Sequence, residues 1–108
     1  MEKILDNKTE EMNEVKDNVL KLSTPVTIND KEVTELEYDL NRITGKTVRI
    51  AIQKLQRLEM AVPSIEYSPI LHSALFATAA NIEFDDVERF NAKDYANAVD
   101  IISDFFTK

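Results

Sequence analysis

The chain has 108 residues, of which 44% are hydrophobic and 31% charged, and its formal net charge is -7. This length suits one small domain, and the acidic balance argues against nucleic acid as a partner, because affinity for DNA or RNA depends largely on Lys and Arg that neutralise phosphates. The sequence contains no Cys, which excludes disulfides and thiolate metal sites, and no apolar run approaches the roughly 20 residues of a membrane span.

Residues 1–21 form an acidic leader with little apolar content. Leu5, Met12, Val15 and Val19 fall at helical spacings, so the segment is either a weakly amphipathic helix or a frayed, partly ordered leader. A third reading is a segment that becomes ordered against a partner. The first residues lack the apolar core of a signal peptide, so we expect a cytoplasmic protein.

The segment from residue 22 to residue 40 has the pattern of a β-hairpin. Pro25 disfavours a helix before it, and apolar residues then alternate with polar ones on both sides of Asn29-Asp30. Asn and Asp tolerate the left-handed backbone that hairpin turns need, and Lys31 and Glu32 are expected to complete a short loop. We predict strands near 22–28 and 33–40, with one apolar and one acidic face.

Helical patterns fill the rest of the chain. We predict helices over about 44–60, 69–80 and 92–106, with a short helix or turn between the last two. Thr44 and Asn91 are expected N-caps, Ser68-Pro69 a cap and first helical residue, and Asp94 a first-turn acid that suits the helix dipole. The expected fold is α+β: one domain over 22–108, in which an N-terminal hairpin precedes a small bundle of three to four helices.

Gly45-Lys46-Thr47 resembles the end of a phosphate-binding loop, but Leu40 stands where the motif needs its first glycine. We therefore expect a turn, in which Gly45 eases the bend from strand to helix. Lys46, Arg49, Gln53 and Arg57 then form one face of the following helix. That face is either an outer face or a contact for an acidic partner, including the C-terminal half of a second copy.

Two other features are weak candidates for chemistry. His72 is the only histidine, and Ser73 beside it would point about 100° away on a helix, so we expect a partly buried, hydrogen-bonded histidine. The acidic run Glu83, Asp85, Asp86 and Glu88 lacks the mid-loop glycine of a calcium loop and is expected to be a solvated face or a docking surface. We predict no catalytic residue, no cofactor and no metal site, and hence no enzyme.

The order of these features resembles the tail assembly chaperones of the protein E type, from contractile-tailed phages and related prophages. The resemblance covers about residues 22–106. It is carried by a strand and hairpin motif, a glycine turn and a C-terminal helix motif, at Leu22, Pro25, Val26, Val33, Glu35, Leu36, Tyr38, Thr44, Gly45, Phe90, Asp94, Tyr95, Ala98, Ile102, Phe105 and Phe106.

The resemblance implies a non-enzymatic protein of the host bacterial cytoplasm that binds the tape measure protein and keeps it soluble until tail tube subunits assemble around it. It also implies absence from the mature virion, and a longer form, made by ribosomal frameshifting, that helps recruit tube subunits. The alternatives are a structural tail or head–tail connector component of the virion, and an acidic regulator of a DNA-binding protein.

Such a role needs an apolar groove between helices and a charged outside. Ile102, Phe105 and Phe106 are the predicted partner-binding residues, as one wall of that groove; ordinary core packing is the alternative for all three. The edge of the hairpin offers self-association by strand pairing.

Overall fold

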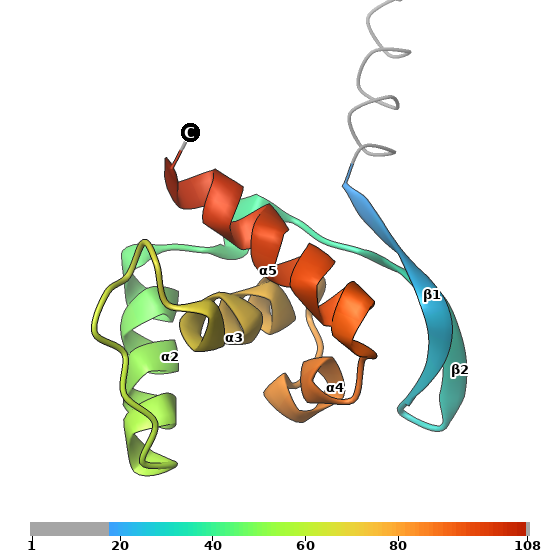
Figure 1. The fold of residues 1–108 in the computed structure, drawn as a ribbon, viewed down its shortest axis with the longest axis horizontal. Helices are drawn as coiled ribbons and strands as arrows, with labels where there is room; N and C mark the ends of the chain where they lie inside the picture. The colour runs from blue at the N-terminus through green and yellow to red at the C-terminus, as the bar shows by residue number, and fades with distance from the viewer. Residues whose placement is uncertain (1–17, 108) are drawn as a thin grey trace, which may run out of the picture.

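The computed structural model describes residues 18–107, so most of the leader prediction lies outside the described residues. An antiparallel hairpin precedes four α-helices, which confirms the α+β fold class (Figure 1). The elements in chain order are β1 (Val19–Ile28), β2 (Lys31–Glu37), the 3-10 turn η1 (Leu40–Arg42), α2 (Gly45–Arg57), α3 (Pro69–Ala80), α4 (Phe84–Glu88) and α5 (Ala92–Thr107).

The hairpin turn is tighter than predicted. Asn29 and Asp30 have φ angles of 53° and 67°, and Ile28 pairs directly with Lys31. Two consecutive left-handed residues between paired strands are typical of a two-residue hairpin turn. The expected loop at residues 31 and 32 is therefore wrong, because both residues already belong to β2.

The two strands do not keep one register. Lys21 pairs with Glu35 and Val26 with Val33, so residues 22–25 of β1 stand opposite the single residue Thr34. The predicted alternation holds only in part, since Leu36 is buried but Thr34 is exposed. Extra residues in one strand bend and twist a hairpin, and here the bend carries β1 toward the helices.

The bulged part of β1 is attached to the start of α5 through Asp94, which is 1% exposed. Its carboxylate accepts hydrogen bonds from the amides of Ser23, at 3.0 and 2.9 Å, and of Thr24, at 3.3 Å. Asn91 caps α5 as predicted, its Oδ1 accepting from the Asp94 amide at 2.8 Å, and its Nδ2 donates to both hydroxyls of the bulge. Asp94 thus joins the hairpin to the helices. The sequence predicted only that its charge would suit the helix dipole, and did not predict this contact.

Helix α3 is the centre of the molecule, and α2, α4 and α5 all pack against it (Figure 1). Most of its side chains are buried, as its nearly continuous apolar sequence predicts. Pro69 begins it and Asn81, with φ 60°, ends it in the left-handed region, so the predicted bounds are confirmed. The predicted Ser68 side-chain cap is absent, because Ser68 Oγ accepts from the Ser64 amide instead.

Helix α2 ends at Arg57, earlier than the predicted position near residue 60. Glu59 adopts φ 62°, and the Met60 amide donates back to the Leu55 carbonyl at 2.9 Å. A left-handed residue just past the last turn ends a helix in this way. The left-handed residue Glu59 therefore ends the helix two to three residues before the predicted position. In the part of the chain from 18 to 107, no helix combines the length and apolar character that crossing a membrane requires.

Candidate binding groove

The Gly45-Lys46-Thr47 segment is the capped start of α2. Thr44 Oγ1 accepts from the Thr47 amide at 3.2 Å, and Thr47 Oγ1 accepts from the Thr44 amide at 2.8 Å. This reciprocal arrangement confirms Thr44 as the N-cap. Gly45 has no positive φ, and a Cβ added there would meet nothing within 4 Å, so the backbone requires no glycine. The predicted role of Gly45 in easing the bend is wrong.

His72 is hydrogen-bonded, as predicted, but it is fully rather than partly buried. Its Nε2 lies 2.8 Å from the Ile65 carbonyl oxygen, and since a carbonyl can only accept, this nitrogen donates. Ser73 Oγ donates to Ile70 of the same helix, at 2.8 Å, rather than to the imidazole. The ring stacks on Phe106, with centroids 5.6 Å apart. His72 is therefore a structural contact between α3, α5 and the chain that connects α2 to α3.

The acidic run is partly structural. Asp86 Oδ2 accepts from the Glu83 amide at 2.9 Å, and Asp86 Oδ1 pairs with Arg89 at 2.8 Å. Arg89 also donates to the Thr27 carbonyl of the hairpin. Within residues 18–107 no three acidic or histidine side chains are grouped so that they could hold a metal ion. Asp86 thus helps to cap α4 and, through Arg89, to hold it against β1.

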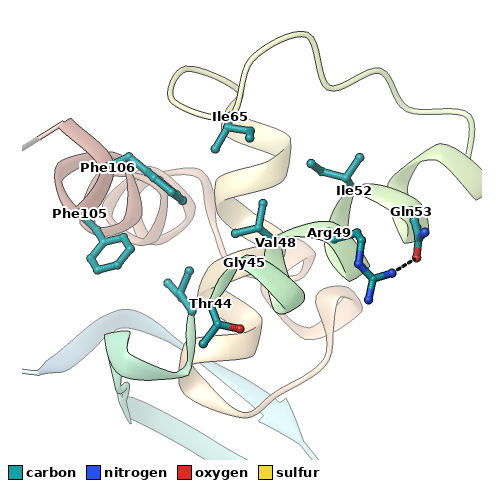
Figure 2. Close-up of a pocket in the computed structure, with 10 residues that line it drawn as sticks. Thr44, Gly45, Val48, Arg49, Ile52, Gln53, Ile65, Phe105 and Phe106 are labelled. Carbon is teal, nitrogen blue, oxygen red and sulfur yellow. Dashed lines mark hydrogen bonds between the residues drawn. The ribbon is translucent and has the colours of Figure 1, made fainter.

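An apolar groove lies between α2 and the C-terminal end of α5, beneath the connection from α2 to α3 (Figure 2). Its volume is about 540 Å³. Aliphatic and aromatic side chains make up most of its lining, which consists of Ile43, Thr44, Gly45, Val48, Arg49, Ile52, Gln53, Ile65, Phe105 and Phe106. Among residues 18–107, Arg49 is the one charged residue in the lining, so this surface suits an apolar occupant better than a polar substrate.

Helices α2 and α5 both pack on α3, and the groove lies between the N-terminal half of α2 and the C-terminal end of α5. Ala51 and Leu55 of α2 are buried in the core, whereas Val48 and Ile52 are half-buried and line the groove. On the upper side in Figure 2, Ile65 projects from the connection between α2 and α3. His72 contacts both the Ile65 carbonyl of this connection and the Phe106 ring of α5.

The three predicted partner-binding residues separate into two groups. Phe105 is 41% exposed and Phe106 half-buried; both line the groove, and their ring centroids lie 5.3 Å apart. Ile102 is fully buried and does not line the groove, so it belongs to the core. For Ile102 the structure favours the alternative of ordinary packing.

Most of the groove lining outside α5 was not predicted from the sequence. Val48 and Ile52 belong to the apolar side of α2 but are only half-buried, whereas Ala51 and Leu55 are fully covered by the core. Excess width of an apolar stripe is a signal that could have indicated a second contact face. Ile65 lies outside any helix or strand, so no periodicity could have identified it.

The hairpin edge on the β2 side carries acidic side chains. In the described part of the chain β2 pairs with β1 alone, and Glu32, Glu35 and Glu37 are exposed along it. Charged residues on an edge strand discourage pairing with an identical strand. Self-association through this edge stays a prediction.

Comparison of the chain with protein-family models, with curated proteins and with solved structures finds no match. What the groove binds must therefore be inferred from its own shape and chemistry and from the sequence resemblance described above.

Proposed function

We propose that this chain is a phage tail assembly chaperone that holds an amphipathic helix of the tape measure protein in the groove between α2 and α5. The observation that carries the proposal is the open apolar groove of about 540 Å³, with Phe105 and Ile65 at its margins. The resemblance to tail assembly chaperones supports the identity of the partner.

An amphipathic helix fits this surface for physical reasons. Such a helix presents apolar side chains at every third or fourth residue, and a hydrophobic groove removes them from water. Phe105 and Ile65 are 41% and 44% exposed in the free chain, so an occupant would bury apolar surface on both partners. Burial contributes about 25 cal/mol for each Å² of apolar area removed from water. Covering the apolar stripes of a long helical protein in this way also prevents its aggregation.

The role is non-enzymatic and transient. In the host bacterial cytoplasm the chaperone keeps the tape measure protein soluble, and it leaves when tail tube subunits assemble around that protein. A longer frameshifted form would recruit the tube subunits. The groove is compatible with release, since its lining is mostly apolar and two of the lining residues, Ile65 and Phe105, are exposed to solvent.

The test is co-expression with the tape measure protein of the same gene cluster. We expect the tape measure protein to become soluble and to co-elute with the chain in size-exclusion chromatography.

Phe105→Ser should reduce the co-eluting amount several-fold, because it removes an aromatic side chain from the groove wall. Leu58→Ser is the matched control, since Leu58 is 49% exposed but does not line the groove. The proposal would be contradicted if both variants reduced the co-eluting amount of tape measure protein equally. It would also be contradicted if the tape measure protein stayed insoluble when co-expressed with the wild-type chain.

Mass spectrometry of purified particles separates the proposal from a structural role in the virion. A chaperone that leaves before the tail is complete should be absent from finished particles. A stoichiometric amount of the chain in those particles would favour the tail or connector component.

A further inference from the structure

The groove has a basic border on one side. Lys46, Arg49, Gln53 and Arg57 recur at steps of three and four residues on α2, which places them in one row along the helix. Arg49 and Gln53 line the groove, and Lys46 and Arg57 continue the row, exposed to solvent. We call these four residues the basic row. Helix α2 contains no acidic residue, although the chain as a whole has a net charge of -7.

The charges of the basic row are not neutralised within residues 18–107. Arg49 Nη1 donates to Gln53 Oε1 at 3.4 Å, a contact between neighbours of the same row. Lys46, Arg49 and Arg57 form no ion pair with a carboxylate of the described residues, in contrast to Arg89, which pairs with Asp86. The remaining base of α2 lies apart from the groove: Lys54 Nζ sits over the Phe84 ring, 5.8 Å from its centroid.

From this arrangement we infer that the groove selects amphipathic helices whose apolar stripe is bordered by Asp and Glu on the side that lies over α2. The inference rests on the proposed function, because it concerns the occupant of the same groove. Apolar contacts supply most of the affinity, while complementary charges at the rim determine which helix is accepted and in which rotation about its axis. An acidic border would meet Arg49 and Lys46, whereas a basic border would meet like charge.

The inference can be tested with two synthetic peptides and the full chain. Both peptides are roughly 18 residues long, about five helical turns, with the same Leu stripe. One carries Glu and the other Lys at the positions beside the stripe, and binding is followed by fluorescence anisotropy of a terminal dye. The net charge of -7 favours the Lys peptide at long range. Tighter binding of the Glu peptide must therefore come from local charge at the groove.

Two charge reversals on α2 locate the effect. Arg49→Glu should weaken binding of the Glu peptide about three- to tenfold, as expected for replacing attraction by repulsion at an exposed pair. Lys54→Glu makes the same charge change on another face of α2 and should leave binding nearly unchanged. Circular dichroism of both variants checks that each remains folded.

The outcomes separate this inference from the proposed function. Tighter binding of the Glu peptide, lost in Arg49→Glu and kept in Lys54→Glu, supports the inference. Equal binding of the two peptides, tighter binding of the Lys peptide, or equal effects of the two reversals would overturn the charge selection and leave the groove as an apolar helix site. Failure of both peptides to bind would contradict the helix-binding groove itself.

Discussion

The carboxylate of Asp94 lies in a position that is 1% exposed, where such a group without hydrogen-bond partners would be costly. Three bonds from the amides of Ser23 and Thr24 compensate that cost. The same bonds satisfy amides that the bulge in β1 leaves without a partner in β2. One side chain therefore fixes the hairpin to the bundle.

We expect Asp94→Ala to lower the free energy of unfolding by about 1.5–3 kcal/mol, because the hydrogen bonds that hold the exposed bulge to the buried carboxylate are lost. Urea denaturation measures the change. Asp100→Ala, at an exposed position of the same helix, makes the same charge change and should stay within about 0.5 kcal/mol of wild type. Similar losses in the two variants would show that the bonds to the bulge contribute little.

His72 connects two parts of the groove lining. It contacts the Ile65 carbonyl and the Phe106 ring but does not itself line the groove. His72→Phe keeps an aromatic ring for Phe106 but removes the donor to the Ile65 carbonyl. We expect faster amide hydrogen exchange in residues 64–67 and a loss of about 1–2 kcal/mol in stability. Unchanged exchange in that connection would mean that the histidine does not hold it.

At the scale of the elements, the hairpin turn is the clearest case of local chemistry that determines structure. Asn29 and Asp30 both occupy the left-handed region, where glycine is the least strained residue. Asp30→Gly should therefore raise the free energy of unfolding by roughly 0.5 kcal/mol, and Asp30→Ala should lower it. Thermal unfolding followed by circular dichroism is sufficient to rank the three proteins. The reverse order would contradict the two-residue turn.

Elements with local signals were predictable, and those that depend on tertiary contacts were less so. Pro69 and the apolar run after it predicted α3 within its observed bounds, and Thr44 predicted the start of α2. The start of β1 at Val19 was missed because the pattern of residues 1–21 is equally compatible with a helix. The bulge opposite Thr34 was missed because it is stabilised from α5, about 70 residues away in sequence.

At the scale of the whole molecule, the groove results from the way α3 places α2 and the C-terminal end of α5 on either side of it. The sequence indicated Ile102, Phe105 and Phe106 as one wall, and of these Phe105 and Phe106 line the groove while Ile102 is in the core. It could not indicate that Val48, Ile52 and Ile65 form the rest, because their proximity to α5 depends on how α3 orients α2. For the same reason, the basic row could be recognised in the sequence but not placed beside a groove.

The measurement that tests the central claim most directly is a titration of the 15N-labelled chain with an amphipathic peptide from the tape measure protein, followed by two-dimensional NMR. We expect the largest amide shifts to cluster at Val48, Arg49, Ile52, Ile65 and Phe105, and the amides of Val33 and Glu35 in the hairpin to stay unchanged. Shifts concentrated along β2, or no shifts at a saturating peptide concentration, would contradict the claim.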